Sequence, residues 1–208
     1  MPLHRQWQPD THSLAAIWRI AEPEAFFNDA TGLFAEGIHA EKRRLEHLSG
    51  RFLLRHLKQD FPLLSIAKDE HDKPRLPLNR YHFSISHSFP YVAAIVSDRY
   101  ECGLDIQCFR EGMLRLQHKF LSEAEQAYFG NNEKLLTMAW CAKEAAYKWQ
   151  GRRGVEFIEH MPIISTAVKT GSAQFLIRLP LLPDCPEIPI NGWLEEDFAF
   201  AVVRHFIR

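Results

Sequence analysis

Apolar residues recur along this chain with two spacings, and each spacing predicts a different kind of element. A repeat of three to four residues predicts a long helix over 36–59 and another over 133–150, the latter ending near Gly151. Alternating or short continuous apolar runs predict strands. We expect strands at 82–86, 91–96, 101–108, 163–168, 174–179, 192–196 and 198–206, and either a strand or a short apolar connection at 14–20.

Capping and turn signals add the shorter elements. Pro23 between two glutamates predicts a helix start. Two short helices are expected over 114–120 and 122–129, the second opened by a capping box between Ser122 and Glu125. Residues 68–80 are expected to form a loop.

Each half of the chain therefore contains one long helix followed by several strands. This order predicts an α+β fold of two similar lobes, each a long helix packed on a small, mostly antiparallel sheet. We expect an N-terminal lobe over 1–100 and a C-terminal lobe over 101–208, related by a pseudo-two-fold axis.

Composition narrows the possible partners. A net charge of −1 provides no overall attraction to nucleic acid. No run approaches the roughly 20 apolar residues of a membrane helix, and the N-terminus carries no apolar signal segment. The four cysteines form no CxxC pair, so we expect neither a zinc site nor a disulfide framework. This cysteine usage fits a protein of the reducing cytoplasm.

The predicted strand over 101–108 carries two oxygen-bearing side chains on one face. Asp105 and Gln107 alternate with Leu104 and Ile106, and Gly103 would permit close approach. Two oxygen donors spaced in this way can reach one hard cation. The alternative is a sheet whose polar face simply meets solvent.

The helix over 133–150 carries a carboxylate and an amine one turn apart. Leu135, Ala139, Ala142, Ala146 and Trp149 form an apolar stripe, and Glu144 and Lys148 lie opposite it. The pair could be an ordinary surface salt bridge. However, Trp140 and Tyr147 flank it, and large rings are unusual on a fully solvated face.

Further anion-binding candidates precede these two segments. His87 and Ser86 end a predicted strand, where they could contact phosphate or be ordinary loop residues. A basic face carries Lys42, Arg43, Arg44 and Arg51, and Lys73 lies in the 68–80 loop; these side chains could hold phosphates or could simply be solvated.

The order of these motifs resembles the 4′-phosphopantetheinyl transferases. The motifs are Lys73-Pro74, Ser86-His87, Gly103-Leu104-Asp105-Ile106 and Trp140-x-x-Lys143-Glu144-Ala145-x-x-Lys148. The chain length and the two-lobe pattern are similar to the Sfp-type branch, which is single-chain and pseudo-dimeric. The resemblance implies an active site between the lobes, Mg²⁺ as cofactor, coenzyme A as co-substrate and an apo acyl or peptidyl carrier protein as partner. It also implies a monomer, because the two lobes are fused.

The resemblance also assigns roles by position. Asp105, Gln107 and Glu144 would hold Mg²⁺ beside the pyrophosphate of coenzyme A. Glu144 would help deprotonate the carrier serine, and Lys148 would stabilise the leaving 3′,5′-ADP. The implied catalytic residues are Glu144, Lys148 and His87, and the implied coenzyme A contacts are Arg44, Arg51, Lys73, Ser86, His87 and Lys148.

One position departs from the family pattern. The family usually has a third acidic residue where this chain has Gln107. A neutral amide oxygen is a tolerable Mg²⁺ ligand but should weaken metal affinity. Two alternatives stay open: a non-catalytic coenzyme A or nucleotide binder of the same fold, and a metal-dependent phosphohydrolase. The second would need a denser cluster of acidic and histidine ligands than the sequence offers.

Overall fold

The chain divides into two units between Cys102 and Gly103, and each combines one long helix with an antiparallel sheet. The computed structural model describes residues 2–203. The fold is α+β with two lobes of this kind, as the sequence predicted. The expectation of a site shared by the two units stays a prediction.

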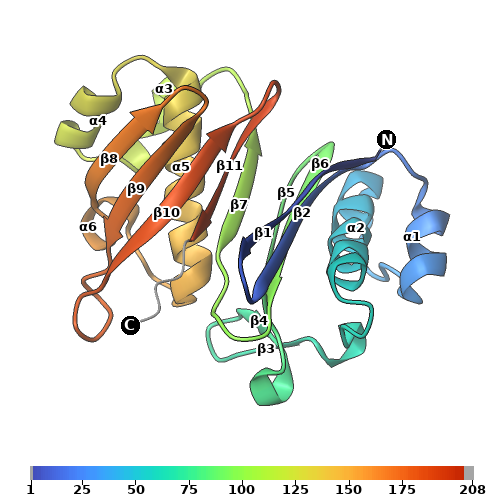
Figure 1. Cartoon of the computed structure of the whole chain (residues 1–208). Coiled ribbons are helices and arrows are strands. Elements are labelled where there is room, and N and C mark those ends of the chain that lie inside the picture. Colours follow the sequence, from blue (N-terminus) through green and yellow to red (C-terminus); the bar gives the residue numbers. More distant parts are fainter. Residues whose placement is uncertain (1, 204–208) are drawn as a thin grey trace. The chain divides into compact units, whose positions relative to one another are not determined.

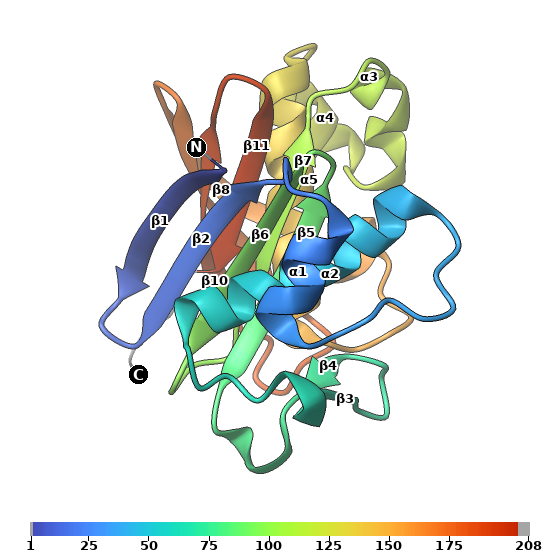
Figure 2. The same ribbon diagram turned by 90° about the vertical axis from the view of Figure 1, so that its right-hand side faces the viewer.

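The first unit is a four-stranded sheet covered by helices. Its antiparallel strands follow the order β1-β2-β6-β5, with bounds Leu3–Asp10, Ser13–Arg19, Tyr91–Ser97 and His82–Ser88. Helix α2 (Glu41–Leu57) packs on β2, β5 and β6, and α1 (Glu24–Thr31) packs on α2 (Figures 1 and 2). Leu48 and Leu53 of α2 are fully buried against the sheet, which explains the helical spacing of these apolar residues.

The link between α2 and β5 is mostly irregular, as expected for 68–80. It contains only two short 3₁₀ turns, Leu63–Ser65 and Pro77–Asn79, and a two-stranded hairpin formed by β3 (Ala67–Lys68) and β4 (Pro74–Arg75).

The second unit is a five-stranded antiparallel sheet with α5 across one face (Figure 1). Helix α5 (Glu133–Gln150) packs on β7, β10 and β11. The strand order is β7-β11-β10-β9-β8, with bounds Leu104–Cys108, Phe198–Val203, Glu187–Leu194, Ser172–Arg178 and Ile163–Lys169. The shorter helical segments are α3 (Met113–Leu116), η3 (Gln117–Lys119), α4 (Glu123–Phe129) and α6 (Phe157–His160).

A glycine lets α5 approach β7 closely. A Cβ atom on Gly103 would lie 2.2 Å from the carbonyl oxygen of Ala145 and 2.7 Å from Cβ of Trp149. No side chain fits in that space, so the sequence Gly-Leu-Asp places the strand backbone directly against the helix.

Several predicted boundaries were wrong. Helix α2 begins at Glu41 rather than 36, because the chain turns at Gly37, where φ is +76°. Strand β7 begins at Leu104 rather than 101. Strand β10 begins at Glu187, five residues before the predicted start, and includes Pro189. Residues 204–206 of the last predicted strand lie outside the described residues.

Other boundaries were confirmed. Helix α5 spans the predicted 133–150 and ends at Gly151, whose φ of +75° is the left-handed C-cap conformation. The capping box of Ser122 and Glu125 is present at α4.

The predicted apolar stripe of α5 was too narrow, because Leu136, Met138 and Cys141 are also fully buried.

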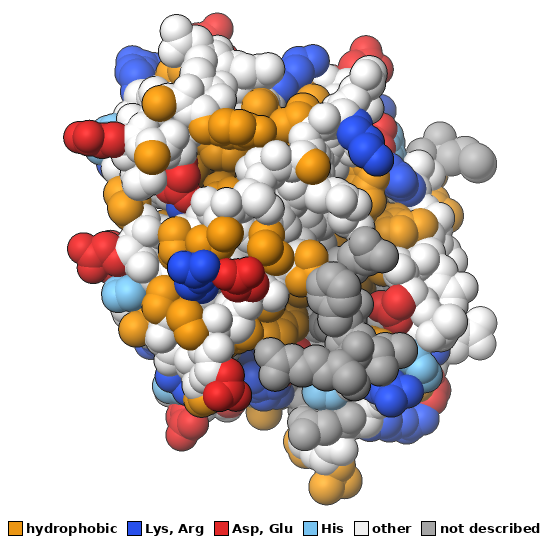
Figure 3. Space-filling view, turned by 60° about the vertical axis from the view of Figure 1, so that its left-hand side comes forward, with side chains coloured by type: hydrophobic (Ala, Val, Ile, Leu, Met, Phe, Trp, Pro, Cys, Tyr) orange, Lys and Arg blue, Asp and Glu red, His pale blue; other side chains and the backbone are white. Residues whose placement is uncertain are grey.

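The surface carries mixed charge. The face in Figure 3 shows Lys and Arg side chains beside Asp and Glu side chains, with apolar side chains exposed between them. None of the helices in the part of the chain that the structure describes has the length and apolar character needed to cross a bilayer.

Candidate active site

Asp105 lies on the face of β7 that meets α5. It pairs with Ala201 of β11, and only 5% of its surface is exposed. Because side chains alternate along a strand, Gly103, Asp105 and Gln107 share this face. The contact of Gly103 with α5 identifies the face. The polar side of this strand is therefore covered by a helix, and the alternative of a solvated sheet face is wrong for Asp105.

Lys148 reaches from α5 to this buried carboxylate. Its Nζ lies 2.6 Å from Oδ1 of Asp105, as a hydrogen-bonded ion pair. The lysine side chain is 27% exposed, so the ammonium joins a buried strand position to a more open region. The pair joins a strand carboxylate to a helix amine forty-three residues away in sequence, whereas the sequence had suggested a salt bridge between Lys148 and Glu144.

Glu144 lies one helical turn before Lys148. The pKa of Glu144 is raised from its usual 4.5 to about 7, because burial and, to a smaller extent, the nearby charge of Asp105 raise it more than Lys148 lowers it. The dominant cause is desolvation of the charged form. Two carboxylates thus lie close enough to repel each other, and a carboxylate that titrates near neutrality is suited to proton transfer.

Cys141 lies beside the same carboxylates. Burial raises the pKa of its thiol well above the usual value, and the charge of Asp105 and a hydrogen bond to Asp105 act in the same direction. The thiol therefore stays protonated. The thiol also donates to the carbonyl oxygen of Ala199 of β11 at 3.4 Å.

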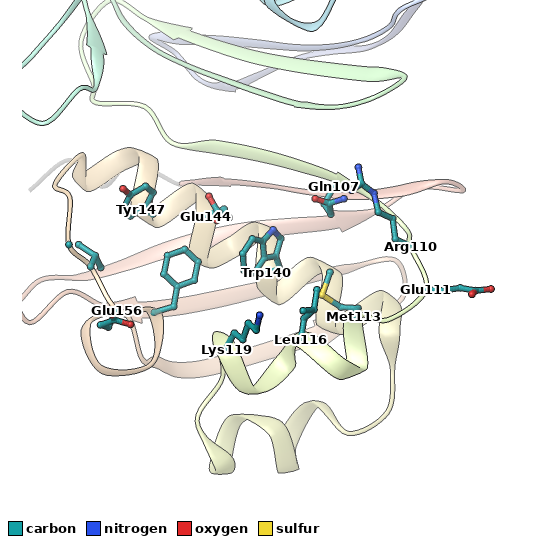
Figure 4. A pocket seen from close by; sticks show the side chains of 13 residues that line it. Gln107, Arg110, Glu111, Met113, Leu116, Lys119, Trp140, Glu144, Tyr147 and Glu156 are labelled. Carbon is teal, nitrogen blue, oxygen red and sulfur yellow. The ribbon is translucent and has the colours of Figure 1, made fainter. Parts of the chain in front are cut away.

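Glu144 and Gln107 both line a pocket of about 710 Å³ in the second unit. In Figure 4, Trp140, Glu144 and Tyr147 come from α5, whereas Met113, Leu116 and Lys119 form the opposite side. Val155 and Phe157 complete a largely apolar wall. A polar group of unusual pKa beside an apolar pocket is the arrangement expected of a binding or catalytic site.

The donor set fits a hard divalent cation. Asp105 and Glu144 offer carboxylate oxygens, and Gln107, on the same face of β7, offers an amide oxygen. A cation between the carboxylates would relieve the repulsion that raises the pKa of Glu144. Within residues 2–203, no group of three or more His, Cys, Asp and Glu side chains is arranged to hold a metal ion. A site here would depend on Gln107 or water for its third ligand.

The predicted phosphate contacts of the first unit lie on α2 and β5. Nδ1 of His87 is 3.4 Å from Oε2 of Glu46, which is buried. His47 lies beside Arg51 and His87; burial and these two positive neighbours lower its pKa to about 4. Arg51 and His87 therefore both lie near His47, and both lower its pKa.

Other predicted residues are engaged elsewhere in this unit. Nε of Arg44 is 2.8 Å from Oε2 of Glu24, so this arginine ties α2 to α1. Nζ of Lys73 is 3.1 Å from Oε1 of Glu101. Because neighbouring strand residues point to opposite faces, Ser86, which is buried, lies on the face opposite His87. Their assigned coenzyme A contacts stay predictions.

Sequence reasoning missed His47, Glu46 and Cys141. His47 and Glu46 are one turn from Arg51 and Arg43 on α2, so helical spacing could have grouped them with the basic face. Cys141 lies three residues before Glu144, one turn along α5. Its only sequence signal was a thiol within the helix motif.

Comparison with known families matches the second unit. Residues 101–202, just under half of the chain, match the family model described as the 4′-phosphopantetheinyl transferase superfamily. No curated protein matches the chain. The matched segment contains β7 and α5 and hence Asp105, Gln107, Glu144 and Lys148. This segment is therefore similar to the 4′-phosphopantetheinyl transferase superfamily.

Proposed function

We propose that the protein transfers the 4′-phosphopantetheine arm of coenzyme A to a serine of an apo acyl or peptidyl carrier protein and releases 3′,5′-ADP. The observation that carries the proposal is the group formed by Asp105, Glu144 and Lys148 beside the pocket, inside the matched domain. The match covers the second unit only, so assignment to the Sfp-type branch is part of the proposal.

Glu144 is the proposed base. The serine oxygen attacks the phosphorus that bears the pantetheine arm, a new P–O bond forms, and the bond to 3′,5′-ADP breaks. The serine proton passes to Glu144 directly or through one water. Glu144 must be ionised to accept this proton, and a cation held between Glu144 and Asp105 would favour the ionised form over the raised pKa of the metal-free site.

Lys148 is the proposed partner of the leaving group. Negative charge grows on the departing phosphate oxygen as the P–O bond breaks, and a nearby ammonium stabilises it. Because Lys148 is already held by Asp105 at 2.6 Å, its direction is set before substrate arrives.

Asp105, Glu144 and Gln107 are the proposed Mg²⁺ ligands. Bound there, the ion would neutralise charge on the diphosphate oxygens. The two carboxylates would compensate its charge, and Gln107 would add a neutral oxygen.

We propose that the apolar pocket binds the segment of the carrier protein that bears the serine. The serine must reach Glu144, and the pocket extends from Glu144 along Trp140 and Tyr147. The proposed coenzyme A contacts in the first unit are Arg44, Arg51, Lys73, Ser86 and His87. Of these, Arg51 and His87 are supported by their shared positive neighbourhood at His47.

We place the reaction in the cytoplasm and expect a monomer. All four cysteines are free thiols, which fits a reducing compartment.

The test is to incubate the protein with coenzyme A, Mg²⁺ and apo carrier proteins of the fatty-acid, polyketide and peptide-synthetase kinds, and to follow the mass gain of the arm. Asp105→Asn and Glu144→Gln should each lower the rate by about a hundredfold or more. Glu111→Gln is the control, because this exposed carboxylate lines the same pocket but points away from its centre (Figure 4).

The assay also separates the alternatives. A coenzyme A binder without transferase activity would bind coenzyme A and leave every carrier unmodified. A phosphohydrolase would cleave coenzyme A without any carrier present. Either result contradicts the proposal.

A further inference from the structure

Lys143 is fully buried in the middle of α5, directly before Glu144. A lysine is almost never completely buried without a partner. Its Nζ lies 2.9 Å from Oε1 of Glu125, and burial lowers the pKa of Lys143 while Glu125 opposes the fall. A buried ion pair of this kind adds little net stability compared with apolar residues of the same size. Its presence therefore needs another explanation.

The remaining contacts of the ammonium suggest one. Nζ of Lys143 donates to the carbonyl oxygen of Phe120 at 2.7 Å and to that of Phe157 at 3.1 Å. Phe120 follows η3, and Phe157 begins α6. Lys143 thus ties α5 to two separate backbone segments, and each segment contributes residues to the wall of the pocket.

The rings of the same two residues pack on Trp140. The ring centroids of Phe120 and Trp140 are 5.2 Å apart in an edge arrangement, and those of Phe157 and Trp140 are 5.6 Å apart. Phe157 also contacts Tyr147 at 5.9 Å. Trp140 and Tyr147 both line the pocket beside Glu144. The residues whose carbonyls bind Lys143 therefore determine where the aromatic wall lies.

Glu125 fixes the other end of this arrangement. Its Oε2 accepts from the backbone N–H of Ser122 at 2.7 Å, and its Oε1 accepts from that of Ile163 at 2.8 Å. The N-terminus of α4 and the start of β8 are thereby joined to the same ammonium. Every group in this network is hydrogen-bonded, which makes it rigid.

We propose that Lys143 is a positioning residue: through the carbonyls of Phe120 and Phe157 it sets the position of Trp140 and so shapes the pocket that receives the carrier beside Glu144. The inference rests on the proposed function for the identity of the ligand. The arrangement of the wall can be measured without it.

The key variants are Lys143→Met and the double variant Lys143→Met/Glu125→Gln. The single variant removes the ammonium and leaves a buried carboxylate without its counter-charge, so it is expected to be less stable. The double variant removes both charges and should regain part of that stability, because glutamine keeps an acceptor for only one of the backbone N–H groups of Ser122 and Ile163. Both lack the donor to Phe120 and Phe157. Lys134→Met, an exposed lysine on the same helix, is the control.

The first readout is independent of activity. Labelling with 5-fluorotryptophan gives five fluorine resonances, one per tryptophan, and Trp140→Phe identifies that of Trp140. We expect this resonance to shift or broaden in both Lys143 variants and to stay unchanged in Lys134→Met. If the double variant keeps the parent Trp140 resonance, the inference is wrong and Lys143 is only the charge partner of Glu125.

The second readout is kinetic. The aromatic wall would contact the carrier equally before and during the reaction, so a displaced wall should raise KM for the carrier by about tenfold and change kcat by less than about threefold. KM for coenzyme A and the Mg²⁺ dependence should not change. An unchanged carrier KM in the double variant overturns the inference. A parent protein without transferase activity contradicts the proposed function instead, and the fluorine spectra still decide the role of Lys143.

Discussion

At the scale of single residues, the active-site group is defined by how charge is distributed over few side chains. Asp105 is buried and forms an ion pair with Lys148. The pKa of Glu144 is raised to about 7, and Gln107 offers an uncharged amide oxygen. Each of these differences can be measured by changing one side chain.

Gln107→Glu should strengthen Mg²⁺ binding. The substitution adds negative charge on the face of β7 that carries Asp105, and a hard cation is bound more tightly by more anionic ligands. We expect activity to saturate at lower Mg²⁺ than in the parent, with carrier preference unchanged. A Mg²⁺ titration that overlays the parent curve would show that residue 107 does not face the ion.

Glu144→Gln should stabilise the metal-free fold at high pH while removing activity. The pKa of Glu144 is about 7 in the folded protein and 4.5 as a free side chain, so folding favours the protonated form. That stability is complete below pH 4.5 and is lost as the pH rises through 7. The loss amounts to about 3 kcal/mol at pH 8, and glutamine avoids it.

The measurement is chemical denaturation in EDTA at pH 5 and pH 8. The advantage of Glu144→Gln over the parent should be about 1 kcal/mol at pH 5 and about 3 kcal/mol at pH 8. Glu111→Gln, at an exposed carboxylate of the same pocket, is the matched control. An equal advantage at both pH values would contradict the assigned titration.

At the scale of elements, the site depends on how closely α5 lies on β7. Asp105 can meet Lys148 because Gly103 permits that approach. The same helix also contacts β10 at Gly192, but there the neighbour is the flexible side chain of Met138, 2.7 Å from a built Cβ.

Gly103→Ala should therefore destabilise the protein more than Gly192→Ala. The first substitution forces the backbone of α5 away from β7, at a cost of about 3 kcal/mol or more. The second requires only that Met138 change conformation, at a cost nearer 1 kcal/mol. Thermal or denaturant unfolding gives the comparison, and activity measured below the transitions should fall only for Gly103→Ala. Equal losses would mean that the helix is not seated as described.

At the scale of the whole molecule, ligand binding should be visible as stability of the full chain. Coenzyme A at a hundredfold its Kd stabilises the native state by about 2.7 kcal/mol, which raises Tm by about 5–10 °C in a chain of this size. We expect most of this rise to require Mg²⁺ in the parent, and the Mg²⁺-dependent part to be absent from Asp105→Asn. Calorimetric scans with EDTA or Mg²⁺ test this, and identical shifts in the two conditions would argue against a metal at Asp105.

Local patterns in the sequence determined the elements of this protein. Helical spacing predicted α5 to the residue, with Gly151 as its end signal. Alternation predicted β5, and a continuous apolar run predicted β6. The α+β class followed from the order of these elements. The predicted start of α2 at residue 36 was wrong, because the chain turns at Gly37 and the helix begins only at Glu41.

Motif spacing also singled out Asp105, Gln107, Glu144 and Lys148 as the residues with chemical potential. Within the second unit the tertiary structure decided which of them meet. Pairing of Lys148 with Asp105 arises from α5 packing on β7, and the nearby Asp105 contributes to the raised pKa of Glu144. Burial of Lys143 arises instead from the segments that contain Phe120, Glu125 and Phe157. Sequence spacing along one helix cannot report this, because desolvation and ion pairing depend on what covers a side chain from another element. The sequence thus identified the functional side chains, and tertiary packing determined their ionisation and their orientation.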